Sequence, residues 1–195
     1  MIFLLFAFVF FGWENQSPSE YNIRIYDESK LKIHGTSNVN TFSFEYDPEY
    51  LQDDMCVTVK SNSDRISFEN AILNLKVKGF DSGNRIMNND LYELLKADLY
   101  PSVTIDFQSV VPKMKGAHHK SLFLNAKVRL AGQVHNELIE VNPQKLDEHY
   151  HYNGVATLNL RNYCIEPPVK FLGLVKVQEE LTINFDLKFE ASENS

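Results

Sequence analysis

The strictest constraint on the fold of this chain is a period-two alternation of apolar and polar residues. Every second residue of 181–189 is apolar, and the residues between are polar. An extended segment with this pattern has one face for a protein interior and one for water. The segments 103–107 and 122–130 repeat it, and clusters rich in Gly, Asn, Asp and Ser separate such runs. The sequence therefore predicts an all-β fold, either a sandwich or a barrel.

The same parity assigns shorter runs to the interior. We expect Val57 and Val59 to point inward, together with Leu138 and its neighbours. Seven aromatic residues fall on inward faces, namely Phe42, Phe44, Tyr46, Phe68, Phe107, Phe185 and Phe189. Cys56 shares its parity with polar neighbours and is expected to face outward. Cys56 and Cys164 are therefore expected to be free thiols, since a bridge needs Cα atoms within about 7 Å.

One segment, 84–98, has a helical period. Its apolar residues Met87, Leu91, Leu94 and Leu95 fall at i, i+4, i+7 and i+8. This spacing places them on one side of an amphipathic helix. Pro101 follows shortly afterwards and prevents the helix from continuing. We therefore expect an antiparallel barrel or sandwich with one inserted helix.

The first residues form an uncharged apolar run, IFLLFAFVFF at 2–11. Ten residues are too few to cross a bilayer core of about 30 Å. They match the apolar part of a secretory signal peptide, although a buried N-terminal strand would also account for them. We expect a signal peptide and linker over 1–18, a single domain over 19–195, and a periplasmic or secreted protein. No later apolar run approaches membrane-spanning length, so no stable membrane insertion is expected once the leader is removed.

Charge and motifs exclude several functions. The chain has 19 Lys and Arg against 26 Asp and Glu, a net charge of −7. Nucleic-acid binding is not expected, because it requires a basic face. The sequence contains no phosphate-binding Gly-rich loop and no zinc-protease or nucleophile-elbow motif. We expect no cofactor and treat the scattered acidic residues as solvated surface.

The histidines are the remaining candidates for chemistry. His149 and His151 are two residues apart and would share one face of a strand, which is a geometry that a metal can use. His118 and His119 lie together in a basic loop. A metal site needs a third, well-oriented ligand that the sequence does not identify. We therefore expect polar loops here, with neither a metal site nor catalytic residues.

Several motifs together resemble one family. The segment 29–42, SKLKIHGTSNVNTF, resembles the first-strand motif of the YceI-like family of exported lipocalin-like barrels, in its Bacteroidetes-type variant. Residues 85–96 and 100–107 resemble the helix and following strand that this family places together. The segments 127–132 and 165–168 resemble a later strand and the closing segment. The resemblance covers almost all of the chain after the leader.

This resemblance implies a lipocalin-like barrel, an exported location and an apolar ligand, without catalysis. Characterised members of the family bind a long isoprenoid chain, of the quinone or polyprenyl kind, lengthwise in the barrel. Better-known members carry a His-Ser pair in the first motif, where this chain has Gly35-Thr-Ser-Asn38. The contacts to a ligand head group are therefore not carried over.

Three hypotheses for the function remain at this point. The first is non-enzymatic binding of an isoprenoid or other lipid in a cavity whose mouth is capped by the helix. The second is a secreted structural or interaction domain with a filled core and no small ligand. The third is an enzyme that uses the region of His149 and His151. The sequence does not decide whether the protein is a monomer or a homodimer. For the first hypothesis the expected cavity wall consists of Phe42, Phe44, Val103, Ile105, Phe107, Leu124, Val128, Leu158, Ile183, Phe185 and Leu187.

Overall fold

The structure is a computed structural model that describes residues 17–51, 54–62, 65–112, 121–146, 149–170 and 173–194. The proposed leader at 2–11 lies outside the described residues, as do His118 and His119. None of the helices in the described ranges combines the length and apolar character needed to cross a bilayer.

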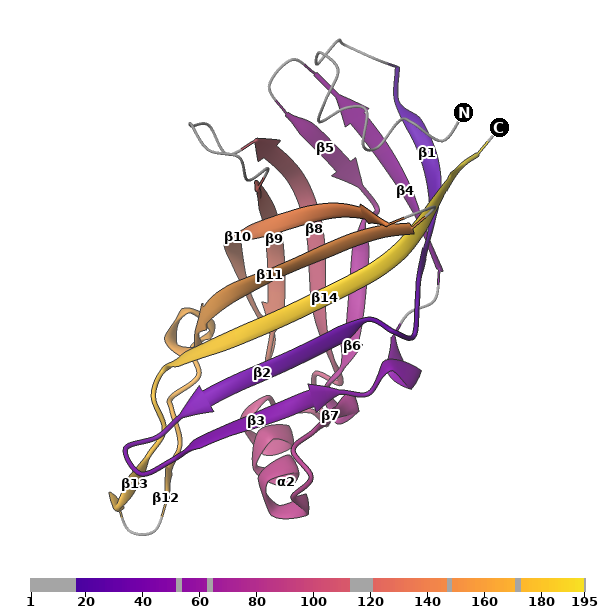
Figure 1. The fold of residues 1–195 in the computed structure, drawn as a ribbon. Coiled ribbons are helices and arrows are strands. Elements are labelled where there is room, and N and C mark those ends of the chain that lie inside the picture. Colours follow the sequence, from indigo (N-terminus) through magenta and orange to yellow (C-terminus); the bar gives the residue numbers. More distant parts are fainter. Residues whose placement is uncertain are drawn as a thin grey trace.

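Eight of the described strands close into an antiparallel ring (Figure 1). Their order around the ring is β1-β4-β5-β8-β9-β10-β11-β14, and β14 pairs with β1 to complete it. The predicted all-β barrel is therefore confirmed. The strands are β1 (Ser19–Ile25), β4 (Asp54–Ser61), β5 (Ile66–Glu69), β8 (Ser102–Pro112), β9 (Leu122–Leu130), β10 (Gln133–Leu146), β11 (His149–Asn159) and β14 (Glu180–Glu193).

The two ends of the barrel are built from different strands. β14 pairs with β2 (Lys30–Thr36) along its first half and with β1 along its second half. β8 pairs with β6 (Ile72–Lys76) before a bulge at Phe107/Ser109 and with β5 after it. Such a bulge bends the strand and lets it change partners. β3 (Thr41–Tyr46) and β7 (Phe80–Asp81) extend the sheet beyond β2.

Short elements connect these strands. The hairpin of β12 (Val169–Lys170) and β13 (Val175–Lys176) projects beside the turn between β2 and β3 (Figure 1). The Asn38 side chain binds this hairpin, since it donates to the Leu174 carbonyl and accepts from the Lys176 N–H. The 3-10 helices are η1 (Pro48–Tyr50), η2 (Val77–Gly79) and η3 (Leu160–Tyr163).

The predicted helix is present as α2 (Arg85–Leu94), at the end of the barrel formed by β3 and β7 (Figure 1). The Asn84 side chain caps it by accepting hydrogen bonds from the N–H groups of Ile86 and Met87. The helix ends four residues before the predicted boundary at 98. Lys96 has φ +53°, a left-handed conformation that stops the helical hydrogen-bond pattern. Sequence periodicity continues into this turn because Leu95 still packs inward.

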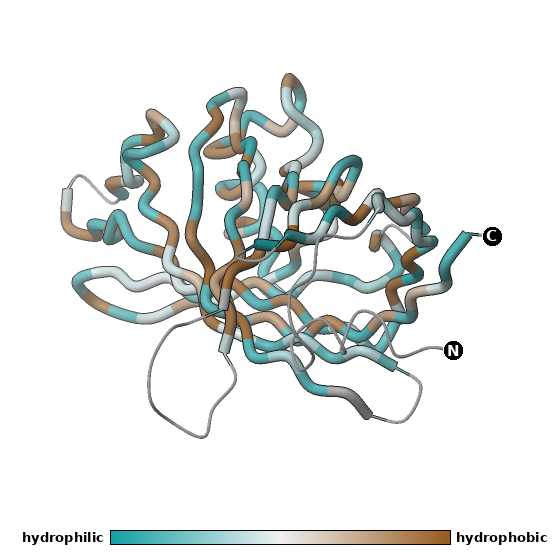
Figure 2. The backbone as a smooth tube through the Cα atoms, turned by 90° about the horizontal axis from the view of Figure 1, so that it is seen from above, coloured by the Kyte–Doolittle hydropathy of each residue, from teal (hydrophilic) through white to brown (hydrophobic). Residues whose placement is uncertain are grey.

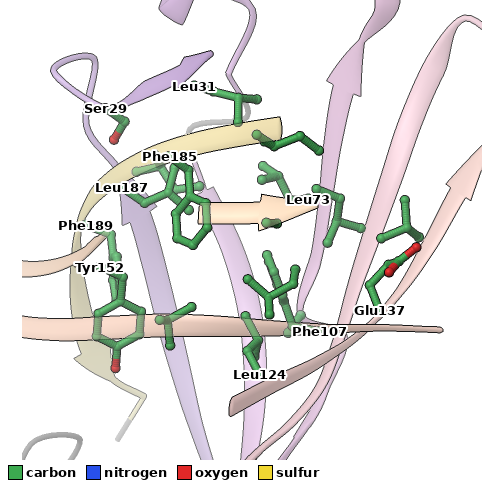
Figure 3. A pocket seen from close by; sticks show the side chains of 18 of the residues that line it. Ser29, Leu31, Leu73, Phe107, Leu124, Glu137, Tyr152, Phe185, Leu187 and Phe189 are labelled. Carbon is green, nitrogen blue, oxygen red and sulfur yellow. The ribbon is translucent and has the colours of Figure 1, made fainter. Parts of the chain in front are cut away.

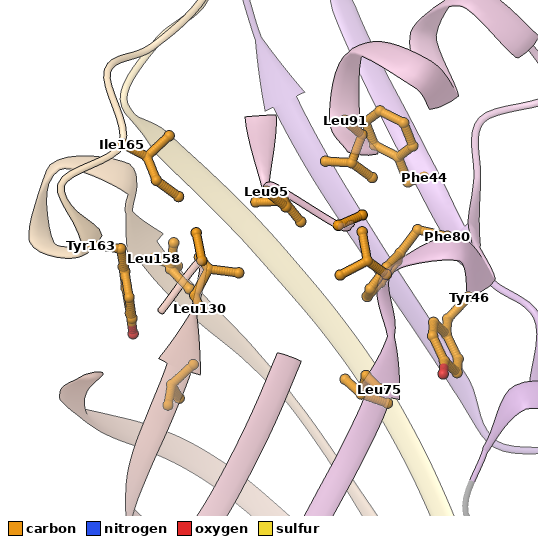
Figure 4. Packing of buried hydrophobic residues seen from close by; sticks show 14 of the residues in the cluster. Phe44, Tyr46, Leu75, Phe80, Leu91, Leu95, Leu130, Leu158, Tyr163 and Ile165 are labelled. Carbon is orange, nitrogen blue, oxygen red and sulfur yellow. The ribbon is translucent and has the colours of Figure 1, made fainter. Parts of the chain in front are cut away.

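One cluster of buried hydrophobic side chains lies beside α2. We call this cluster the helix-end core. Its side chains come from α2, β3, β6, β9, β11 and the segments next to them, and all are at most 8% exposed (Figure 4). The cluster includes Phe44, Tyr46, Leu75, Phe80, Leu91, Leu95, Leu130, Leu158, Leu160, Tyr163 and Ile165. It closes this end of the barrel with packed side chains.

Parity is confirmed along most of the wall, where apolar and polar residues alternate (Figure 2). Val57 and Val59 are buried, and Cys56, which shares its parity with Thr58, is exposed, as predicted. Cys164 is also exposed, and both cysteines are free.

The prediction for Leu138 is wrong by one residue. Leu138 is 61% exposed, whereas Ile139 pairs with the inward Leu124 and is half-buried. A shift of one residue exchanges the two faces of a strand. Leu138 and Ile139 are adjacent and both apolar, so they do not show which of them points inward. The buried Val141 decides this, because it shares its face with Ile139. The inward set of β10 therefore includes Glu137, which lies opposite Ala126.

Candidate ligand-binding cavity

The barrel encloses a cavity of about 250 Å³. Protein interiors are normally packed with few voids larger than a water molecule, so this space is not a packing defect. Its lining is almost wholly aliphatic and aromatic, and Figure 3 shows part of it, including Phe107, Leu124 and Phe185. Apolar cavities of this kind accept apolar molecules and do not hold ordered water.

The predicted wall residues divide into two groups. Eight line the cavity, namely Ile105, Phe107, Leu124, Val128, Leu158, Ile183, Phe185 and Leu187. Phe42, Phe44 and Val103 do not line it, since Phe44 belongs to the helix-end core and the other two pack against that core. Val128 and Leu158 belong both to the helix-end core and to the cavity wall. The rings of Phe42 and Phe44 meet edge to face, with centroids 6.1 Å apart. Parity thus identifies the inward face of a strand, but not the depth along the barrel at which a residue lies.

β14 shows that the interior is not filled. Its inward side chains, from Leu181 to Phe189, are all only partly buried. In a packed barrel such residues would be shielded as completely as Phe44 or Phe80, which are 4% and 2% exposed. Four of the five β14 residues line the cavity, so the half-buried side chains of this strand border the unfilled space.

Gly154 on β11 contributes to the shape of the wall. It pairs with Phe185, and a Cβ at this glycine would lie 2.5 Å from Cζ of the Phe185 ring. The missing side chain therefore lets the phenyl ring lie close against β11. Sequence analysis did not identify Gly154, because a glycine within an alternating run shows only that something approaches the backbone closely.

One acidic side chain belongs to this interior. Glu137 lines the cavity, and its side chain is only 17% exposed, so the prediction that the acidic residues are solvated surface is wrong at this position. Tyr163 donates a hydrogen bond of 2.7 Å to Glu137 Oε1, and His135 Nδ1 lies 3.2 Å from the same oxygen. The only signal in the sequence is that Glu137 lies two and four residues before Ile139 and Val141, and therefore on the same face of the strand.

Two tyrosines near the cavity stay neutral far above physiological pH. Burial raises the pKa of Tyr163, and the hydrogen bond to Glu137 and the charge of Glu137 raise it further. Burial raises the pKa of Tyr152, whose ring lines the cavity, to about 12. The Tyr163 hydroxyl therefore remains a hydrogen-bond donor to Glu137.

Besides Glu137, the cavity lining has polar residues at the start of β2. Lys30 is exposed and also lines the cavity, which indicates that the space reaches solvent here. Ser29 is 4% exposed, and its hydroxyl donates to the Lys188 carbonyl while accepting from the Lys188 N–H. These bonds fasten the turn before β2 to β14, at the place where β14 changes partner from β2 to β1.

The histidine pair lies away from this cavity. His149 contacts the Tyr26 ring edge to face at 4.8 Å, and His151 Nε2 is hydrogen-bonded to Asp186. Within the described part of the chain, no three His, Cys, Asp or Glu side chains are grouped to hold a metal ion.

Two solved structures have the same architecture. BcnA of Burkholderia cenocepacia is 17% identical, with a TM-score of 0.61, and the match covers 83% of this chain and 96% of BcnA. A polyisoprenoid binding domain from Saccharophagus degradans is 13% identical, with a TM-score of 0.61 and coverage of 88% and 98%. These likenesses show that the three proteins share one fold. This shared fold agrees with the lipocalin-like barrel that the resemblance seen in the sequence implies.

Other comparisons add little to this result. The YceI protein of Campylobacter jejuni is 10% identical, with a TM-score of 0.48 and coverage of 87% and 86%. No protein-family model and no curated protein matches the sequence. At identities of 17% and 13%, the likeness to the first two structures is one of fold alone, and the Bacteroidetes-type variant stays a prediction.

Proposed function

We propose that this YceI-like barrel binds one apolar or amphiphilic molecule, an isoprenoid or another lipid, in its central cavity and carries out no catalysis. The observation that carries the proposal is the unfilled apolar space behind the half-buried side chains of β14. A structure of the same fold is described as a polyisoprenoid binding domain, which supports this class of ligand.

Burial of the ligand's apolar part in the cavity would supply the binding affinity. Each square ångström of apolar surface removed from water contributes about 25 cal/mol, less the cost of immobilising the ligand. The preformed wall lowers that cost because few of its side chains must reorganise. The alternative of a filled structural barrel is disfavoured by the same cavity.

Analysis of what the protein carries tests the proposal directly. Native mass spectrometry of the purified protein should show a bound species, and solvent extraction should identify it as an isoprenoid or another lipid. After delipidation, a hydrophobic fluorescent probe should bind with a negative heat-capacity change. A long prenyl alcohol should displace this probe. If the delipidated protein binds neither the probe nor the alcohol, the proposed function is wrong.

We also propose that the protein is exported, on the basis of the apolar run at 2–11. Expressed from its first residue in a Gram-negative host, the protein should be recovered from the periplasm. Its intact mass should show the loss of at least residues 1–12. An uncut chain in the cytoplasmic fraction would contradict export without affecting the cavity.

A further inference from the structure

The carboxylate of Glu137 is an unusual group on the wall of this cavity. The other lining side chains are nearly all aliphatic or aromatic, and Figure 3 shows Glu137 among them. A carboxylate that is largely removed from water is costly unless it is hydrogen-bonded or paired with a charge. No Lys or Arg of the described residues forms a salt bridge with Glu137, and the one charge partner there is His135, which pairs with Glu137 only when it is protonated.

The protein satisfies one side of this carboxylate. Both the Tyr163 hydroxyl and His135 Nδ1 approach Oε1, at 2.7 and 3.2 Å. Within the described ranges, Oε2 has no hydrogen-bond partner. Tyr163 is only 1% exposed and is held in the helix-end core, so it fixes the orientation of the carboxylate from behind. An ionised carboxylate has about four acceptor positions, and the two on Oε2 stay unused.

We propose that Glu137 Oε2 accepts a hydrogen bond from the head group of the bound amphiphile. This inference rests on the proposed function. It names the ligand class as a molecule with an apolar chain and a hydrogen-bond-donating head, such as a prenyl or aliphatic alcohol. A head that carries negative charge is disfavoured, because two like charges would meet where little water can screen them. A head without a donor leaves the carboxylate unpaired and is also disfavoured.

Three compounds with one identical prenyl chain test this specificity, namely the alcohol, its methyl ether and its monophosphate. We expect the delipidated protein to bind the alcohol about tenfold more tightly than the ether, since a hydrogen bond to a charged group typically has this effect. The phosphate should bind more weakly than the ether. Isothermal titration of the unmodified protein gives both ratios without any variant.

Glu137→Gln and Glu140→Gln form a matched pair on β10. Glu140 pairs with Val155, which is 58% exposed, so Glu140→Gln removes the same charge from the outward face of the strand. Glu137→Gln retains an oxygen that accepts from Tyr163. It should reduce the alcohol-to-ether ratio to about twofold and improve phosphate binding about tenfold. Glu140→Gln should leave both ratios unchanged.

The outcomes separate this inference from the proposed function. Failure of all three compounds to bind would contradict the proposed function itself. Equal binding of alcohol and ether by the unmodified protein would overturn the role of Glu137 and leave the apolar carrier intact. Tightest binding of the phosphate, lost in Lys30→Gln, would place the head group at the exposed border of the cavity and would also overturn the inference.

Discussion

Replacement of Ala156 by tryptophan is expected to abolish most ligand binding without unfolding the protein. Ala156 lines the cavity from β11, opposite Ile183 on β14. An indole at this position would occupy the space proposed for the ligand chain. If it displaces about 150 Å² of ligand contact, the loss is ~4 kcal/mol at about 25 cal/mol per Å². We therefore expect affinity for a prenyl alcohol or an apolar probe to fall at least about a hundredfold.

The neighbouring residue provides the control. Val155 is 58% exposed and points out of the barrel, so Val155→Trp adds the same side chain to the opposite face of the same strand. Its affinity for the probe should stay within about twofold of the parent. Equal loss of binding in both variants would mean that β11 is distorted and that the cavity was not tested.

Thermal unfolding distinguishes an open cavity from a filled interior. A tryptophan forced into a packed core causes strain of about 1–3 kcal/mol. In an unfilled cavity it gains contacts instead, so the unfolding temperature of delipidated Ala156→Trp should equal or exceed that of the parent. A large decrease, together with unchanged probe binding, would show that the ligand does not occupy this space.

Much of this fold could be predicted because its determinants are local. The alternation from Leu181 to Phe189 is a property of consecutive residues, and it identifies β14 and its inward face correctly. The helical period at Met87, Leu91 and Leu94 likewise identifies α2. These patterns follow directly from the geometry of a strand and of a helix.

The cavity could be predicted only in part, because depth along the barrel depends on pairing between distant strands. Phe44 and Phe185 have the same parity signal, yet Phe44 is buried in the helix-end core and Phe185 lines the cavity. The difference arises because β3 pairs with β7 next to α2, whereas Phe185 lies opposite Gly154. Glu137 was missed for a related reason, since two adjacent apolar residues left the register of β10 undecided.

The interior therefore consists of a packed part and an open part, and leucine deletions should distinguish them. Leu160 at the start of η3 is 1% exposed and belongs to the helix-end core. Leu160→Ala leaves a void among residues that cannot collapse fully, and we expect a loss of about 3–4 kcal/mol in the free energy of unfolding. Urea denaturation of the delipidated protein, with an unchanged m-value, measures this loss.

Leu187→Ala is the matched deletion in the open part. Leu187 is only partly buried and already borders the cavity, so its truncation enlarges an existing space and creates no new void. We expect a loss of about 1 kcal/mol, the transfer free energy of a half-buried leucine. With a bound prenyl alcohol the cost should rise, because the ligand stabilises the folded protein by RT ln(1 + [L]/Kd) and loses contacts, and therefore affinity, in the variant. Equal losses of about 3–4 kcal/mol for Leu160→Ala and Leu187→Ala without ligand would show a uniformly packed interior and would contradict the carrier function.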